Sequence, residues 1–327
     1  MAINLLNIQP HKVSRDLSGY LTYLYGIPKV GKTTFGSQLP GALILAFERG
    51  YNSLPGVMAQ DITSWGELRQ VMRELKKPEV HEVYKSIIID TVDVAATMCE
   101  KYICNQLGIE NIGDGGWTNN GWSKYKKEFE DTFRSMAQLG YAILFISHSA
   151  DKTFTRKDGT TYNQLVPTCQ RSVNEIVKGM ADIYACADIV NGERKLILRS
   201  LDGTVDCGCR FKYIDPEIPF SYQSLVDALN RAIDKEANET GGQFVTNERH
   251  VENIAPNYDY DALMAEFQTL AGELTTKNGA FYGPKIVQII DKYLGKGKKI
   301  TDTTPDQAEF VYLIVSEIKE DLIEKPN

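Results

Sequence analysis

The nine residues GIPKVGKTT, at positions 26–34, constrain the fold of this chain more than any other feature. They fit the pattern G-x-x-x-x-G-K-[ST] without a mismatch. An apolar segment precedes them, and a segment with a helical pattern begins within them. Glycines in this pattern let the backbone curl so that its amide N–H groups point at phosphate oxygens. The stretch therefore predicts a phosphate-binding loop between a buried strand and a helix, and with it a site for a nucleoside triphosphate.

The side chains of the loop suit a triphosphate and its metal. Lys32 is placed to reach the β- and γ-phosphates, and the Thr33 hydroxyl is placed to bind Mg²⁺. The helix that begins near Lys32 adds the positive end of its dipole. We therefore expect Mg-ATP to be the ligand. The residues expected to bind it are Gly26, Ile27, Pro28, Lys29, Val30, Gly31, Lys32, Thr33 and Thr34.

Apolar segments alternate with amphipathic ones along the first half of the chain. Short apolar runs bounded by glycine or polar residues are typical of buried strands, and apolar residues at helical spacing predict the helices between them. Their alternation predicts an α/β fold, with a mainly parallel sheet between helices. The strands are expected at 20–26, 41–50, 85–91 and 141–149, and the helices at 32–39, 63–77, 92–107 and 122–140.

The second half of the chain has a different pattern. Short alternating segments around Asp202-Gly203 predict a β-hairpin, and a helix is expected from Tyr222 to about Glu236. The polar stretch at 237–257 has no periodicity and is predicted to be a linker. After it, three amphipathic helices are expected in a small module. The predicted organisation is an N-terminal segment at 1–19, an ATPase core at 20–236, the linker at 237–257 and a helical module at 258–327.

Composition argues against several kinds of protein. No apolar run approaches the roughly 18 residues that span a bilayer, and the first residues lack a signal-peptide layout, so we expect a cytoplasmic protein with no membrane partner. No second Cys/His pair lies at zinc-finger spacing from Cys207 and Cys209, so the six cysteines are expected to be reduced thiols. The net charge of −7 argues against a protein that coats polyanions generally, but it leaves room for a local nucleic-acid surface.

Three polar residues lie where predicted strands end. Asp90 ends the aliphatic run SIIID and is expected to hold Mg²⁺ near Thr33. The next residue is threonine rather than a glutamate that could activate water, so Glu48, after an earlier strand, is the candidate base. By fold-level analogy, His148 lies near the γ-phosphate and senses nucleotide state, because the strand it ends lies between the other two. For Asp90 and Glu48 the alternative is an acidic group that merely ends a core strand, and for His148 it is a hydrogen-bonded histidine without a nucleotide role.

The order of these motifs resembles the RecA-like ATPases, and more closely the phage-encoded P-loop proteins that act as RecA-like single-strand annealing or recombination ATPases. The likeness covers about residues 18–236 and rests on the phosphate loop, AFERG, IIIDT, NIGDGGWTNNGW and LFISH in that order. It implies that Glu48 is the catalytic base. It also implies a polar switch residue at 148, where these ATPases usually have Gln and this chain has His.

The resemblance further implies two loops along a path for single-stranded DNA, at 111–122 and 150–167. Both combine aromatic with basic residues, and stacking together with cations along the phosphates holds single strands without sequence preference. The alternatives are tryptophans that pack the first loop down and an ordinary solvated hairpin in the second. The residues expected to contact DNA are Trp117, Trp122, Lys152, Phe154, Arg156 and Lys157.

Such ATPases act as rings or filaments in which a basic residue of one subunit reaches the γ-phosphate of its neighbour. Arg199, Arg210 and Lys212 are candidates, and Arg210 is favoured. The sequence thus predicts a DNA-stimulated ATPase that acts in phage recombination, annealing or replication, with a phage or host protein as a further partner. The alternative is an ATP-gated loader with slow hydrolysis. A small-molecule kinase is a third hypothesis, but neither an arginine-rich lid nor an acceptor pocket is evident in the sequence.

Overall fold

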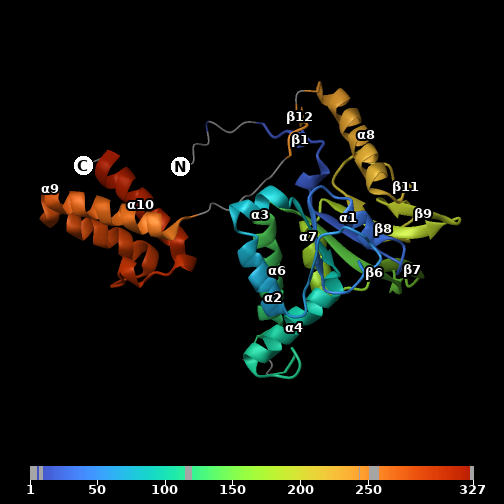
Figure 1. Cartoon of the computed structure of the whole chain (residues 1–327), viewed down its shortest axis with the longest axis horizontal. Helices are drawn as coiled ribbons and strands as arrows, with labels where there is room; N and C mark the ends of the chain where they lie inside the picture. Colours follow the sequence, from blue (N-terminus) through green and yellow to red (C-terminus); the bar gives the residue numbers. More distant parts are fainter. Residues whose placement is uncertain (1–5, 7–9, 115–119, 243, 250–257, 325–327) are drawn as a thin grey trace. The chain divides into compact units, whose positions relative to one another are not determined.

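The structure is a computed structural model of the chain and describes residues 6, 10–114, 120–242, 244–249 and 258–324. It comprises two compact units (Figure 1). The larger is Pro10–Ala255, and the smaller joins Pro256–Asn327 with Met1–Gln9. The larger unit contains two hydrophobic clusters, and the smaller contains a third.

A ten-stranded sheet lies at the centre of the larger unit. Its strands are β2 (Thr22–Gly26), β3 (Ala42–Ala46), β4 (Ala59–Asp61), β5 (Ser86–Asp90), β6 (Ala142–Thr155), β7 (Thr161–Pro167), β8 (Ile183–Val190), β9 (Glu193–Ile197), β10 (Gly208–Cys209) and β11 (Glu217–Pro219). They are ordered β11-β9-β8-β2-β6-β5-β3-β4, with β10 paired to β8 and β7 to β6. From β8 to β4 all neighbours are parallel, which confirms the predicted fold class. As expected, β6 lies between β2 and β5.

Helices cover both faces of this sheet (Figure 1). Tyr23 and Tyr25 of β2 enter one hydrophobic cluster, and Leu24 between them enters the other. Because both faces are buried, the strands are continuous apolar runs rather than alternating ones. The first face packs against α2 (Trp65–Glu74), α4 (Val92–Leu107), α6 (Gly121–Gln138) and α7 (Arg171–Met180), and the second against α1 (Lys32–Ser37) and α8 (Tyr222–Thr240). The short α3 (Pro78–Val83) precedes β5.

Local sequence sets the ends of several helices. The Ser64 hydroxyl accepts a hydrogen bond from the Glu67 amide, 3.2 Å away, and caps α2. Helix α4 ends at Gly108, whose φ of 64° is the left-handed conformation that glycine adopts without strain. The predicted start and end of α4, at residues 92 and 107, are confirmed.

The hairpin predicted around Asp202-Gly203 is wrong. Strand β9 pairs antiparallel with β8, and the turn between them is Asn191-Gly192, where both residues have positive φ, 53° and 82°. The Asp202 carboxylate instead accepts hydrogen bonds from the amide and hydroxyl of Thr204. This local pattern forms a turn without strand pairing, which is why the dipeptide alone misleads.

The stretch at 150–167, predicted to be a loop, is a β-hairpin. Strand β6 continues past His148 to Thr155 and pairs with β7 from Ser149 onward. The alternative of a solvated hairpin is therefore the correct description of its backbone. A single strand of 14 residues runs from the core of the sheet into this exposed hairpin.

The predicted linker at 237–257 is part of the larger unit over the portion that the structure describes. Helix α8 extends to Thr240, and β12 (Val245–Thr246) pairs with β1 (Val13–Ser14). Residues 10–19 of the segment predicted at 1–19 therefore belong to the same unit. The remainder of the linker, residues 250–257, lies outside the described residues.

Arg249 fixes the end of this segment to the sheet. Its guanidinium donates hydrogen bonds to the backbone carbonyls of Ser18, Lys85 and Gly140, at 3.0, 3.0 and 2.7 Å. Burial lowers the pKa of Arg249. These contacts join residues far apart in sequence, so periodicity along the chain does not reveal them.

The smaller unit is helical. It contains α9 (Tyr260–Leu294), α10 (Ala308–Ile318) and a π-helical turn at Lys319–Glu324. Asn278, with φ −165° and ψ 86°, interrupts α9, so the unit has three main helical segments, as expected. Two short 3₁₀ turns, Ile300–Asp302 and Pro305–Gln307, connect α9 with α10.

Two further expectations concern cysteines and membranes. All six cysteines are free, and four of them are buried. Burial raises the pKa of Cys207 to about 12, so this thiol stays protonated at neutral pH. Among the described residues, no helix combines the length and apolar character needed to cross a bilayer.

Phe133 on α6 tests the packing of the first face. It is wholly buried against the rings of Trp65, Phe129 and Phe145. Phe133→Ala should lower the free energy of unfolding by about 3–5 kcal/mol, because it leaves a cavity in the core. Urea unfolding followed by circular dichroism measures the change. The same substitution at Phe154, which is 38% exposed, is the control and should cost less than about 1 kcal/mol. Equal losses would contradict this packing.

Candidate active site

The predicted phosphate loop lies at the carboxyl end of β2 and leads into α1, as the sequence indicates. Gly26 is required because β8 passes close by: a Cβ there would lie 2.1 Å from the carbonyl oxygen of Ala187. Gly31 has a φ of 111° and immediately precedes the helix. The two glycines of the pattern therefore serve different needs, close approach of a strand and a left-handed backbone.

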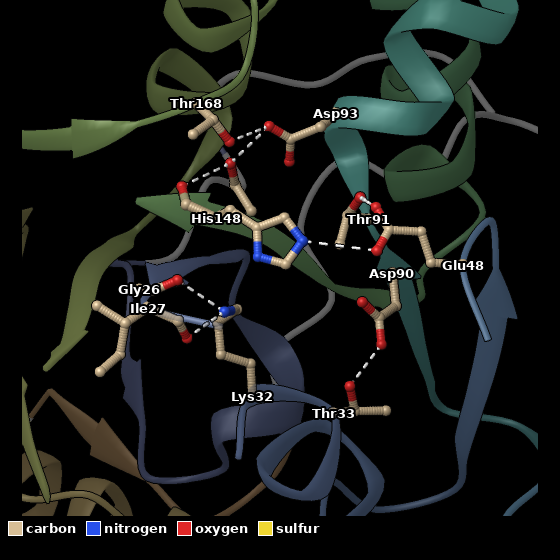
Figure 2. Close-up of polar contacts among 11 residues, drawn as sticks. Gly26, Ile27, Lys32, Thr33, Glu48, Asp90, Thr91, Asp93, His148 and Thr168 are labelled. Atoms are coloured by element: carbon tan, nitrogen blue, oxygen red, sulfur yellow. Dashed lines mark hydrogen bonds and ion pairs between the residues drawn. The ribbon is translucent and has the colours of Figure 1, made fainter. Parts of the chain in front are cut away.

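Lys32 is buried and folds back on its own loop. Its ammonium donates hydrogen bonds to the carbonyls of Gly26, at 2.7 Å, and Ile27, at 2.9 Å (Figure 2). Burial lowers the pKa of Lys32, and the neighbouring carboxylate of Asp90 opposes that shift. The loop carbonyls thus supply the acceptors that a desolvated ammonium needs.

The two residues predicted to hold the metal contact each other. The Thr33 hydroxyl donates to Asp90 Oδ2 at 2.7 Å (Figure 2). Burial raises the pKa of Asp90, and the hydrogen bond from Thr33 opposes that shift. A Cβ on Gly50 would lie 3.0 Å from Thr33 Oγ1 and 3.3 Å from Asp90 Oδ2, so the absence of a side chain leaves space beside both oxygens. A hydroxyl and a carboxylate bordering such a space fit a hard divalent cation.

Glu48 and His148 lie side by side across the ends of neighbouring strands. Glu48 Oε1 accepts a hydrogen bond from the Thr91 hydroxyl at 2.6 Å, and His148 Nε2 lies 3.5 Å from Glu48 Oε2 (Figure 2). The Glu48 amide also donates to the Asp90 carbonyl at 3.0 Å. The structure therefore brings together five residues that the sequence predicts for the site: Lys32 and Thr33 of α1, Glu48 after β3, Asp90 at the end of β5 and His148 of β6.

Asp93, in the first turn of α4, contacts the residues around His148. Its Oδ1 accepts hydrogen bonds from Ser147 Oγ at 3.1 Å and Thr168 Oγ1 at 2.6 Å (Figure 2). The Thr168 amide donates to the His148 carbonyl at 3.0 Å. Sequence reasoning missed this group, although an acid in the first turn of the helix after Asp90 was a possible signal.

Arg194 was also missed, and it contacts the phosphate loop directly. Its Nη1 donates to the Val30 carbonyl at 3.3 Å, and a Cβ on Gly31 would lie 3.5 Å from the same nitrogen. The antiparallel turn at 191–192 brings the start of β9 beside the loop. The dipeptide Asn-Gly in this turn is the strongest short signal for a hairpin and would have located Arg194.

The basic residues predicted from the late β segment lie elsewhere in their own subunit. Arg210 is 64% exposed and pairs with Asp182 at 3.1 Å, beside the amino end of β8 and away from its own phosphate loop. Arg199 donates to the Phe211 carbonyl, and Lys212 lies 3.4 Å from a glutamate of α8. A contact of Arg210 with a neighbouring subunit stays a prediction.

The residues predicted to contact DNA fall on two elements. Trp122 opens α6, is 45% exposed and stands edge-on to Tyr125. On the hairpin, alternation places Lys152, Phe154 and Arg156 on one face. Trp117 lies outside the described residues, and Lys157 occupies the exposed turn of the hairpin.

Tyr162 completes this hairpin face from the opposite strand. It is the cross-strand partner of Phe154, with ring centroids 5.7 Å apart, and the Arg156 guanidinium lies 4.5 Å from its ring. The face is thus a row of aromatic and cationic groups. Strand β6 contains His148 and also forms one strand of the hairpin. It therefore connects the predicted nucleotide site with the predicted DNA-binding face.

Comparisons with known proteins agree with the phosphate-loop assignment. A protein-family model described as "AAA domain" matches residues 18–208, which include Lys32, Glu48, Asp90 and His148. An uncharacterized protein derived from the SPbeta prophage of Bacillus subtilis (strain 168) is 30% identical over 334 residues, which cover 99% of this chain and all of that protein.

A solved structure, the KaiC-like protein PH0186 of Pyrococcus horikoshii OT3, is similar over 59% of this chain and 90% of its own. The identity is 14% and the TM-score 0.34, a likeness too small to bear on function or assembly. The family match and the full-length relative carry the assignment by themselves. The chain belongs to the AAA domain family of P-loop ATPases.

Proposed function

We propose that this protein hydrolyses Mg-ATP and couples that reaction to single-stranded DNA during phage recombination, annealing or replication in the host cytoplasm. The observation that carries the proposal is strand β6, which bears His148 beside Glu48 and, six residues later, Phe154 on an exposed aromatic and basic face. The family match supports ATP hydrolysis. The prophage origin of the relative supports the phage setting.

Binding of ATP would use the loop from Gly26 to Thr34. The triphosphate offers Lys32 acceptors in place of the carbonyls that it now contacts, and a buried ammonium binds an anion strongly because water does not screen it. Thr33 and Asp90 would hold Mg²⁺ in the space that Gly50 leaves open. When bound, Mg²⁺ neutralises charge that develops on the phosphate oxygens.

Hydrolysis would use Glu48 as the general base. The Thr91 hydroxyl fixes one carboxylate oxygen, so the other is free to accept a proton from an attacking water. His148 lies beside that second oxygen and would report whether the γ-phosphate is present. Self-association into a ring or filament remains part of the proposal, with Arg210 as the residue that acts on a neighbour.

Glu48→Gln tests the assignment of the base. The amide keeps the shape of the side chain but does not accept the proton, so turnover should fall by about 10²–10⁴-fold. ATP affinity should stay within about threefold of the parent, since the side chain does not hold phosphate. Phosphate release and titration with a fluorescent ATP analogue measure the two quantities. Glu74→Gln, on the exposed surface of α2, is the control and should leave both unchanged. Parental turnover in Glu48→Gln would overturn the assignment.

Arg194 is proposed to contact the phosphates of ATP bound in the same subunit, because its guanidinium already lies at the loop. Arg194→Ala should weaken binding of the ATP analogue by about tenfold or more, since hydrogen bonds to charged groups are the stronger kind. Arg210→Ala removes the same side chain away from the loop and should leave the affinity of a single subunit unchanged. Fluorescence titration of both variants gives the comparison. Equal affinities in the two variants would refute the contact.

The hairpin face of Lys152, Phe154, Arg156 and Tyr162 is proposed to bind single-stranded DNA, together with the exposed ring of Trp122. Phe154→Ala should weaken binding of labelled oligo(dT) by about 5–100-fold, because stacking contributes about 1–3 kcal/mol per base. Thr153→Ala changes the opposite face of the same hairpin and is the control. Anisotropy titrations at one fixed salt concentration provide the affinities. Unchanged affinity in Phe154→Ala would remove the hairpin from the DNA path.

The smaller unit favours a second candidate function, an ATP-gated loader that recruits a phage or host protein. Phe281, Val287 and Phe310 on its helices are 41%, 55% and 41% exposed. Exposed apolar side chains on a separate helical unit suit a partner surface. Turnover that stays slow in the presence of oligo(dT) would favour this second function, and stimulated turnover favours the first.

A further inference from the structure

A polar cavity of about 430 Å³ lies next to the candidate active site. It is bordered by α4, by α6 near its start and by the segment that leads into α7. None of the groups that face it is assigned to ATP or to DNA above. Its polar lining residues are Asp93, Thr97, Glu100, Tyr125, Thr168 and Gln170.

The cavity is acidic. Asp93, Thr97 and Glu100 stand four and three residues apart on α4 and therefore share one side of the helix. Within the part of the chain that the structure describes, no lysine, arginine or histidine lines the cavity, and neither carboxylate forms an ion pair. Two acids thus face one volume without a compensating cation among the described residues.

Two buried polar atoms at this cavity have no hydrogen-bond partner among the described residues. Tyr125 is wholly buried, and its hydroxyl is one of them. The other is Asp93 Oδ2, whereas Oδ1 of the same carboxylate accepts two hydroxyl hydrogen bonds. Buried polar groups are nearly always paired in folded proteins, so these two atoms point to a ligand that supplies hydrogen-bond donors.

We propose that this cavity binds an organic cation, a guanidinium or primary ammonium group. Such a group supplies a positive charge that pairs with the carboxylates of Asp93 and Glu100. It also supplies several N–H donors for Asp93 Oδ2 and the Tyr125 hydroxyl oxygen. The described residues form no cluster of three or more metal-binding side chains, which argues against a bare metal ion. The two carboxylates repel phosphate, which separates this site from nucleotide and DNA.

A ligand in the cavity would affect the active site through the hydrogen bonds of Asp93. Oδ1 of this carboxylate accepts hydrogen bonds from Ser147 and Thr168, and these residues also contact the backbone of His148. The cation has two possible sources, a free small molecule or a basic side chain of a second copy of this chain. Both present the same chemistry to the cavity.

Calorimetric titration of the full chain with agmatine, which carries both cationic groups, tests the proposal. Saturable binding is expected, and Glu100→Gln should weaken it at least about tenfold because it removes one of the two charges. Glu110→Gln removes an equal charge outside the cavity and should bind agmatine like the parent. Equal affinity for the Glu100→Gln and Glu110→Gln proteins would overturn the site. These readouts need no ATP turnover, so they are independent of the proposed function.

Tyr125→Phe separates ligand binding from folding. Because its hydroxyl has no hydrogen-bond partner among the described residues, the melting temperature without ligand should stay the same or rise, while agmatine binding weakens severalfold. Tyr141→Phe is the control: its hydroxyl donates to the Leu75 carbonyl at 2.9 Å, so its loss should lower the melting temperature. Parental agmatine affinity in Tyr125→Phe would contradict a role for the hydroxyl in the site.

Sedimentation velocity distinguishes the two sources. If the chain self-associates, does not bind agmatine, and loses self-association in Glu100→Gln but not in Glu110→Gln, the cation belongs to a second copy. If agmatine binds and Glu100→Gln weakens that binding while Glu110→Gln does not, the site takes a free small molecule. The proposal is overturned if the chain does not bind agmatine and Glu100→Gln causes no loss of self-association that Glu110→Gln lacks.

Discussion

The buried ammonium of Lys32 organises the active site. A desolvated charge is unfavourable unless polar groups surround it, and here the carbonyls of Gly26 and Ile27 meet that need. To do so the loop must curl around the side chain, which in turn requires Gly26 against β8 and the left-handed backbone at Gly31. The neighbouring carboxylates then lie at adjacent strand ends within reach of the same charge.

The other polar groups of the site are paired in a similar way. Thr33 contacts Asp90, and Glu48 contacts Thr91 and His148. Each pair satisfies groups that would otherwise lack partners, whereas His148 Nδ1 is buried without a hydrogen bond to another described residue. A nucleotide bound here as proposed would exchange these contacts for its own, so its net binding energy would be the difference between two hydrogen-bonded states rather than the sum of new contacts.

The fold was predictable where local patterns decide it. Strands of a parallel sheet that is covered on both faces must be apolar on both faces. Tyr23 and Tyr25 enter one hydrophobic cluster and Leu24 the other, so the whole run is apolar and is recognised in the sequence as a buried strand. The predictions failed where two dipeptides each suggested a hairpin turn, or where a contact joined residues far apart in sequence. Asp202-Gly203 satisfies its own hydrogen bonds, while the true hairpin turns at Asn191, and Arg249 bonds carbonyls that lie more than a hundred residues away.

The residues of the candidate site were likewise predictable only in part. Glu48, Asp90 and His148 were predictable because Glu48 follows β3, Asp90 ends β5, and His148 of β6 lies level with the end of β2. The carboxyl ends of parallel strands meet at one edge of the sheet. Arg194 was not, because it reaches the loop on a strand that runs the opposite way. The resemblance to RecA-like proteins led to a recombination role, whereas the family match establishes only an AAA domain ATPase.

The length of β6 has a mechanical consequence. His148 and Phe154 are six residues apart on one uninterrupted strand, a separation of about 20 Å at roughly 3.3 Å per residue. Paired backbone along most of that length makes the segment stiff, so in the proposed function it would tilt as a unit rather than bend. A tilt of about 5° at His148 displaces the far end by about 2 Å, comparable with the difference between a stacked base and a lost contact.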